Sequence, residues 1–227
     1  MIKIENWEVV GWEHAIRGMR NPMNSWERSD SFWTYIEDPE TLQTANFEFF
    51  VGDVDKELMQ KLANGGPVHA KYRRMIVVYL DIIAPLYWWK EFDTYKVGTV
   101  VNSCSTMHKI HSKEFELDDF SYDHLDELSI SILERVISNL NFNREMFVNY
   151  DSYKGGKPEK KSLWWQMIQL LPSSYNQKRT VMLNYETLSN IYEHRKDHKL
   201  DEWRELCKWI ETLPHSDIII NKVEENT

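Results

Sequence analysis

The most informative group of side chains lies near the C-terminus, where an arginine falls among apolar residues. Arg195 follows Ile191 by four positions and Tyr192 by three, a spacing that places side chains on one face of a helix. An arginine on a buried face needs a partner, because an unpaired charge is costly to bury. Continued at helical spacing, the same face carries three more polar residues, His198, Lys199 and Glu202.

This stripe has two interpretations. It could present a guanidinium, an imidazole and a carboxylate to an anionic or carbonyl-rich ligand. It could equally be a solvent-exposed helix held by salt bridges, with the aliphatic part of Arg195 lying on apolar surface. The periodicity by itself favours the second interpretation.

A second group surrounds Cys104, which lies in a polar run. Cys104, His108 and His111 could form half of a zinc site with Asp118 or Asp119, because thiolate and imidazole are ordinary zinc ligands. Without a second Cys or His pair to complete the site, a loop that contains polar residues is the simpler interpretation, and we expect no metal. Cys104 could also act as a nucleophile, although a lone Cys is most often a small packing residue.

The third group is the run Trp88-Trp89-Lys90. Tandem indoles beside a cation could stack a nucleobase or a flavin ring. Tandem tryptophans are more often part of a core or an interface, because each ring buries a large apolar area.

The elements that must position these groups follow from periodicity and from Gly and Pro stops. We expect strands over 2–12, 47–51 and 180–183, and helices over 13–20, 55–64, 67–83, 123–140, 162–171 and 184–213. Residues 86–109 are expected to be strand and loop, and 150–161 a polar linker. Helices therefore dominate a small mixed sheet, which predicts an α+β fold.

Two helix details are specific enough to test. Asn184 is expected to be the N-cap of the last helix, because Asn side chains accept hydrogen bonds from the first free backbone N–H groups. The helix over 123–140 is expected to bury one apolar stripe, made of Leu125, Leu128, Ile132, Val136 and Leu140.

Composition limits the class of protein. A chain of 227 residues with 42% hydrophobic residues suits one domain, 1–227, with a sizeable core. The formal charge of -9 disfavours a binder of nucleic-acid polymers, since such binding depends on clustered Lys and Arg. The two cysteines, and the lack of a signal peptide or of a long apolar stretch, lead us to expect a cytoplasmic protein without a membrane segment.

The C-terminal third resembles the flavin-dependent thymidylate synthase (ThyX) family. That family has a Leu-Pro-x-Ser element, an Asn twelve residues after the proline and an Arg eleven residues after the Asn. Here these are Leu171-Pro172-Ser173-Ser174, Asn184 and Arg195, without a gap. Asn190 also matches, and the run 198–204 resembles the family's H-A-Q-W-E-I-R after a one-residue deletion. Two weaker similarities lie upstream, at 15–17 and at 66–69.

The family's signature, R-H-R-x-x-S-x-N-E-x-S-x-R-Y, falls on the segment 94–108 and is poorly kept. Thr94 and Met107 stand where the family has arginines, and Glu186 stands at a position that is usually basic. Comparable chemistry remains at four positions, Lys96, Thr99, Asn102 and Ser105.

What the resemblance implies can be stated by residue. It assigns the nucleotide substrate to Arg195, Ser105, Lys96 and Asn102. It assigns FAD to Asn184, Asn190, His198, Glu202, Thr99 and His69. It implies no catalytic side chain, because the flavin performs the difficult step, with NADPH and methylenetetrahydrofolate as co-substrates.

Two functions are therefore open. The first is a flavin-dependent, thymidylate synthase-like methyltransferase acting on dUMP or a related pyrimidine deoxynucleotide. The second is a catalytically inactive relative that binds another nucleotide or a protein partner. The retained stripe around Arg195 favours the enzyme, and the altered signature favours the inactive relative. In either case the resemblance implies a homotetramer whose ligand sites are shared between subunits.

Overall fold

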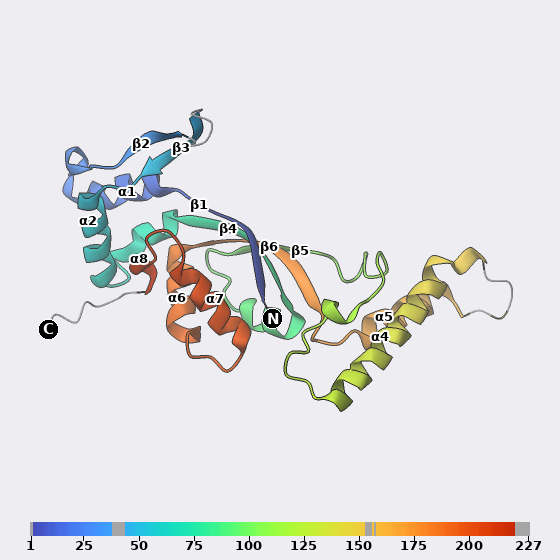
Figure 1. Cartoon of the computed structure of the whole chain (residues 1–227). Coiled ribbons are helices and arrows are strands. Elements are labelled where there is room, and N and C mark those ends of the chain that lie inside the picture. The colour runs from blue at the N-terminus through green and yellow to red at the C-terminus, as the bar shows by residue number, and fades with distance from the viewer. Residues whose placement is uncertain (1, 38–43, 153–155, 157, 221–227) are drawn as a thin grey trace. The chain divides into compact units, whose positions relative to one another are not determined.

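The computed structural model describes residues 2–37, 44–152, 156 and 158–220 (Figure 1). By its internal contacts the chain divides into two compact units. The first unit comprises Met1–Glu5, Asp81–Thr94 and Val101–Thr180. The second comprises Asn6–Leu80, Tyr95–Val100 and Val181–Thr227. Each unit is described separately below.

One four-stranded sheet has the strand order β1-β4-β6-β5. Its strands are β1 (Lys3–Val10), β4 (Val77–Pro85), β5 (Val100–Ser103) and β6 (Asn176–Asn184). Each of these strands has residues in both units. With the helices described next, the sheet makes the α+β class that periodicity predicted.

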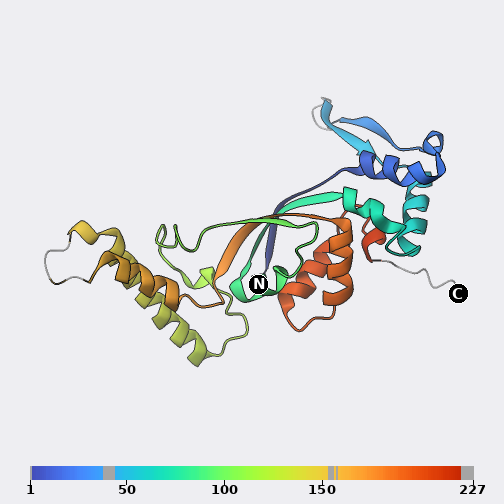
Figure 2. The same ribbon diagram turned by 180° about the vertical axis from the view of Figure 1, so that it is seen from behind.

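The first unit contains three helices, α3 (Leu86–Phe92), α4 (Glu127–Val148) and α5 (Lys160–Leu170). Helices α4 and α5 lie side by side in two opposite views (Figures 1 and 2). Their contact belongs to an apolar core that includes Leu133, Ile137 and Leu140 of α4 and Met167 of α5. Short 3-10 helices lie at Leu117–Asp119 and Tyr150–Ser152.

The second unit contains a two-stranded antiparallel sheet of β2 (Phe32–Glu37) and β3 (Thr44–Phe50). Its helices are α1 (Trp12–Arg20), α2 (Asp53–Asn64), α6 (Tyr185–Arg195), α7 (Asp201–Glu211) and α8 (Asp217–Ile220), with 3-10 turns at Asn21–Met23, Trp26–Arg28 and Ala70–Met75. Helix α6 packs against α7, α8 and the turn Ala70–Met75. Strand β2 was not expected from the sequence.

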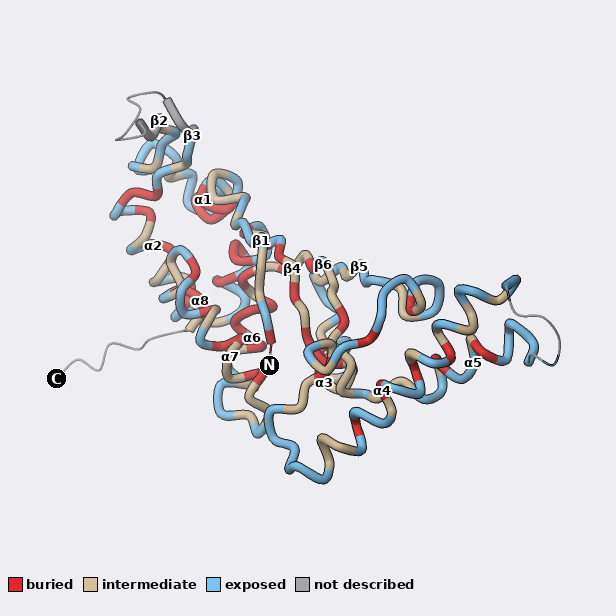
Figure 3. The backbone as a smooth tube through the Cα atoms, turned by 45° about the vertical axis from the view of Figure 1, so that its right-hand side comes forward, coloured by how far each residue is buried: buried red, intermediate tan, exposed pale blue. Residues whose placement is uncertain are grey.

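The predicted helix over 67–83 is wrong, because only Ala70–Met75 is helical and the chain then enters strand β4. Along β4 buried and less buried residues alternate (Figure 3). Val78, Leu80 and Ile82 are all almost completely buried. Apolar side chains buried at every second position, with four β-branched residues in the segment, fit a pleated strand better than a helix. The expectation of strand and loop over 86–109 is also wrong at its start, where α3 forms.

The predicted buried face of α4 is wrong for Leu125, Leu128 and Ile132, which are exposed, although Leu140 is buried as expected. Leu128 is 70% exposed and Ile132 is 53% exposed, whereas Leu133 and Ile137 are buried against α5. The helix is apolar on more than one side, so its sequence alone could not select the face that meets α5. An apolar face is consequently left exposed in the single chain.

The predicted single helix over 184–213 is two helices, α6 and α7, separated by residues 196–200. Arg195 therefore ends one helix, while Glu202 stands in the first turn of the next. The side chain of Arg204 stabilises the turn, because its Nη1 donates to the carbonyl oxygens of His198 (2.7 Å) and Lys199 (3.0 Å). Arg195 and Glu202 therefore lie on two helices joined by a corner and not on one helical face.

The tandem tryptophans belong to the interior of the first unit. Trp88 and Trp89 are both 0% exposed, and they contact each other edge to face with ring centroids 4.9 Å apart. Trp89 Nε1 donates to the carbonyl of Gln177 at 2.9 Å. The core interpretation holds for this pair, and the stacking-platform interpretation is wrong. Among the described residues, no helix is long and apolar enough to cross a membrane.

Candidate functional site

The side chain of Arg195 lies half-buried between two aromatic rings of the second unit. Its Nε donates to the hydroxyl of Tyr95 at 2.9 Å. Its Cζ lies 4.7 Å from the ring centroid of Trp203 and 5.7 Å from that of Tyr95. A guanidinium can rest on an indole face in this way and still present its planar edge to an anion or a carbonyl. We call Arg195, Tyr95, Trp203 and His198 the arginine cluster.

The loop that supplies Tyr95 is fixed to the start of α6. Asn184 caps α6 as predicted, because its Oδ1 accepts from Thr187 N at 3.0 Å. The hydroxyl of Thr187 lies 3.1 Å from the carbonyl oxygen of Val97, to which it can donate. At Gly98, whose φ is +69°, an added Cβ would lie 2.5 Å from Asn184 Nδ2. Only glycine allows this approach, so the loop position depends on it.

Two further residues of this loop were predicted to bind ligands. Thr99 is half-buried, and its hydroxyl oxygen is buried without a hydrogen-bond partner among the described residues. A buried polar atom of this kind costs free energy unless a ligand or another molecule supplies the bond. Lys96, one residue after Tyr95, is exposed.

His198 and Glu202 flank the corner between α6 and α7. His198 Nδ1 accepts from the backbone N–H of Leu200 at 3.2 Å, which assigns the ring proton of the neutral tautomer to Nε2. The ring lies edge to face with Trp203 at 6.3 Å. Glu202 is 5% exposed in the first turn of α7, where the helix dipole favours a carboxylate.

The remaining predicted cofactor residues of the second unit lie on its surface. Asn190 and His69 are exposed. The backbone carbonyl of Asn190 bonds to His194 Nδ1 at 2.7 Å. Glu186, the unexpected acid near the start of α6, is paired with Arg74 Nε at 2.6 Å. This ion pair raises the pKa of Arg74 and offsets the negative charge that would otherwise oppose a phosphate at this helix end.

Ser105 and Asn102, predicted to bind the nucleotide, belong to the first unit. Asn102 is exposed in strand β5. Ser105 Oγ accepts from the backbone N–H of His108 at 3.0 Å and of Met107 at 3.2 Å, and so closes a turn. Cys104 in the same segment is exposed, and its backbone N–H bonds to the carbonyl of Lys178. Within the described ranges, no group of three or more His, Cys, Asp and Glu residues could hold a metal ion.

Sequence reasoning did not nominate Tyr95 and Trp203, although both contact Arg195. A signal for each was present. Trp203 lies on the apolar stripe expected for the last helix, and Tyr95 aligns with the histidine of the R-H-R element. Both had been interpreted as packing or alignment residues, because neither contact is visible until α6 turns back at residues 196–200.

Comparisons with solved structures identify the fold. Two crystal structures of the flavin-dependent thymidylate synthase ThyX from Helicobacter pylori, each with FAD and dUMP, superpose with a TM-score of 0.61. The first is 16% identical and covers 96% of both chains, and the second is 17% identical and covers 97% of this chain and 98% of that chain. No family model and no curated protein matches the sequence. The chain therefore has a ThyX-like fold.

Proposed function

We propose that this protein is a flavin-dependent, thymidylate synthase-like enzyme that binds a pyrimidine deoxynucleotide, dUMP or a relative, beside Arg195. The observation that carries the proposal is the arginine cluster, in a fold whose solved relatives hold FAD and dUMP. Arg195 suits this role because a guanidinium keeps its charge when partly desolvated and forms bidentate bonds with phosphate or with a carbonyl pair.

The residues of the second unit fit a flavin in three respects. The buried hydroxyl of Thr99 lacks a hydrogen-bond partner among the described residues, so a carbonyl oxygen of a bound flavin ring could accept a hydrogen bond from it. The acid at the start of α6, Glu186, is already neutralised by Arg74. The ring of Trp203 and the hydroxyl of Tyr95 both contact Arg195, and a planar, carbonyl-rich ligand needs such a combination of aromatic and polar groups. A bound flavin would supply the redox chemistry, with NADPH as its reductant and a folate as the source of the one-carbon group.

Within this proposal each residue has a limited role. Arg195 and Lys96 bind the nucleotide. Thr99, Asn190, His198 and His69 contact the flavin, while Asn184 and Glu202 hold the ends of α6 and α7 that carry the site. Ser105 and Asn102 stay predictions from the resemblance. We propose further that the chain forms a homotetramer and works in the cytoplasm.

A second function has a specific observation in its favour. Thr94 and Met107 replace arginines, and Ser105 Oγ already accepts two backbone N–H groups. Fewer cations are thus available to hold two phosphate-bearing ligands. An inactive relative that binds another nucleotide or a protein partner would keep the fold and lose turnover.

Titration of the purified protein with FAD and dUMP separates these functions. FAD should remain bound after desalting and give flavin absorption in the blue, and dUMP should bind with Arg195 present. Arg195→Ala should weaken dUMP binding by about tenfold or more, because bonds from charged donors contribute roughly 1.5–3 kcal/mol. Arg135→Ala, at an exposed arginine of α4, is the matched control and should bind dUMP as the unchanged protein does.

Turnover is measured in the same samples with NADPH and methylenetetrahydrofolate, by following conversion of dUMP to dTMP. Binding of FAD and dUMP without conversion would favour the inactive relative. A colourless protein that also takes up no added FAD would contradict the proposed enzyme.

A further inference from the structure

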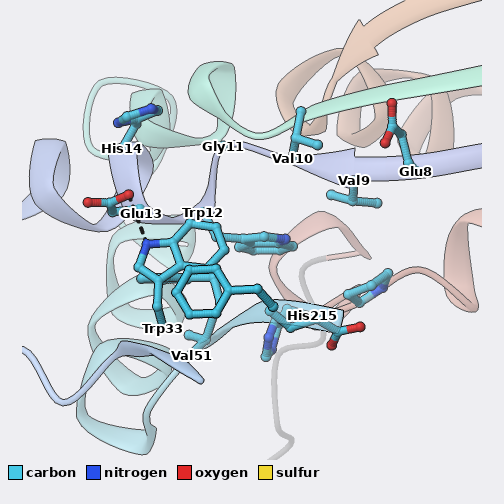
Figure 4. Close-up of a pocket in the computed structure, with 14 residues that line it drawn as sticks. Glu8, Val9, Val10, Gly11, Trp12, Glu13, His14, Trp33, Val51 and His215 are labelled. Atoms are coloured by element: carbon cyan, nitrogen blue, oxygen red, sulfur yellow. Dashed lines mark hydrogen bonds between the residues drawn. The ribbon is translucent and has the colours of Figure 1, made fainter. Parts of the chain in front are cut away.

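A separate cavity of about 670 Å³ lies in the second unit (Figure 4). It is lined by the end of β1, the start of α1, the strands β2 and β3, and the segment before α8. No residue of the arginine cluster lines it. Its volume is in the range of cavities that hold small organic molecules.

Aromatic rings form much of its wall. Trp33 stacks on Phe47 with centroids 4.9 Å apart and an interplanar angle of 9°, and it meets Phe49 edge to face at 5.3 Å. This arrangement follows from the antiparallel register, which pairs Trp33 with Phe49 and places alternate residues on one face of the hairpin. Trp12 contacts His215 edge to face at 5.0 Å from the other side.

The charges of the lining residues have one sign. Three glutamates, Glu8, Glu13 and Glu48, contribute to the lining, and none of the fourteen lining residues is Lys or Arg. Glu13 is held in place, because Trp33 Nε1 donates to its Oε2 at 3.1 Å, the dashed line in Figure 4. Glu8 projects to the opposite side of β1 from Val9 in the same view, so Glu13 is the carboxylate attached directly to the aromatic wall.

His215 adds a neutral polar group. Burial lowers its pKa below the ordinary value, an effect to which the charge of Lys56 adds and which Asp217 opposes. The backbone of His215 has a φ of 52°, a left-handed conformation that is uncommon outside glycine. Strain of this kind is often kept where a side chain must be held in one place.

We propose that this cavity binds a small organic cation, a protonated or quaternary amine carried on an apolar body. Aromatic faces attract such cations through their ring quadrupoles, most strongly for Trp. A carboxylate fixed at the same wall adds Coulomb attraction and a hydrogen-bond acceptor. Nucleotides and other anions are excluded by the negative lining, so the ligand of this cavity differs in charge from that proposed for Arg195.

Choline is a suitable probe because its carbon isostere, in which a tert-butyl group replaces the trimethylammonium group, has the same shape without the charge. Isothermal titration calorimetry of the full chain with each compound, at low ionic strength, gives the two affinities. Because the two ligands have the same shape, the difference in affinity measures the contribution of the positive charge. We expect choline to bind saturably and the neutral isostere to bind about fivefold more weakly or worse. Equal affinities, or no choline binding, would overturn the proposal.

Two variants locate the binding. Glu13→Gln keeps the shape of the side chain and removes its charge, and it should weaken choline binding about fivefold, whereas Glu134→Gln on α4 should leave it unchanged. Trp33→Phe keeps a ring and loses the bond to Glu13, and it should also weaken binding. Unchanged affinity in both pocket variants would refute the site. FAD absorption is measured separately on the same variants. A protein that does not bind choline can therefore be distinguished from one that does not bind FAD.

Discussion

At the scale of single residues, Asp55 holds the most demanding position in the second unit. Its carboxylate is fully buried and accepts from Arg20 Nε at 2.6 Å, from Ser29 Oγ at 2.6 Å and from Ser31 Oγ at 2.7 Å. Arg20 is itself only 3% exposed. The pair therefore joins α1, α2 and the segment before β2, which leads into the wall of the aromatic cavity.

Asp55→Asn should lower the free energy of unfolding by about 3–5 kcal/mol, because it leaves the buried charge of Arg20 unpaired. Chemical denaturation followed by circular dichroism measures this change. Asp53→Asn, two residues earlier in α2, is the matched control, since the ion pair that Asp53 forms with Lys56 is exposed. A loss for Asp55→Asn no larger than for the control would contradict the role of this network.

The two cysteines should react differently with a thiol reagent. Burial raises the pKa of Cys207 to about 12, whereas Cys104 is exposed. Because the thiolate is the reactive form, native protein should titrate about one thiol per chain at mild alkaline pH, and protein in denaturant should titrate both. Cys104→Ser should abolish the native signal. Rapid reaction of two thiols in native protein would contradict this assignment.

At the scale of elements, the binding site depends on the loop over 95–100 being held against α6. Gly98→Ala should displace that loop, because the added Cβ would overlap the Asn184 amide and φ is positive there. We expect dUMP affinity to fall by about tenfold while the helical content stays, since Tyr95 would no longer meet Arg195. Gly156→Ala is a matched control, with a positive φ and open space around its Cβ. Equal affinities in the two variants would contradict the loop's role.

The corner between α6 and α7 decides which side chains contact Arg195. A continuous helix would place Arg195 and Glu202 on one side, and periodicity alone predicts it. The turn at residues 196–200 instead brings Trp203 under the guanidinium. Arg195 and His198 therefore both contact Trp203 through the corner and not through one helical face.

At the scale of the whole molecule, the exposed apolar face of α4 bears on the proposed homotetramer. Leu128, Ile132 and Phe142 project from this helix into solvent in the single chain. Such faces are usually covered at subunit contacts, because burying them removes apolar surface from water. We propose that this part of α4 contributes to a subunit interface.

Leu128→Glu with Ile132→Glu should reduce the assembled mass of the protein in solution while leaving its circular dichroism unchanged. Light scattering after gel filtration measures the mass. Glu134→Gln with Arg135→Ala, on the same helix at exposed polar positions, should leave the assembly intact. A single-chain mass for the unmodified protein would contradict the homotetramer, and an unchanged mass of the double glutamate variant would remove α4 from its interface. The expectation of one domain over 1–227 stays a prediction.

The sequence by itself determined the α+β class, the N-cap at Asn184, the approximate positions of α1, α2 and α5, and the resemblance that the ThyX-like structures support at the level of the fold. These features depend on local spacing, capping chemistry and ordered motifs, which a chain displays without folding. Only the tertiary structure decided that β4 is a strand, which face of α4 is buried, and that Tyr95 and Trp203 meet Arg195. Each of these depends on contacts between residues far apart in the chain, and such contacts override local preference because burial contributes more free energy than propensity.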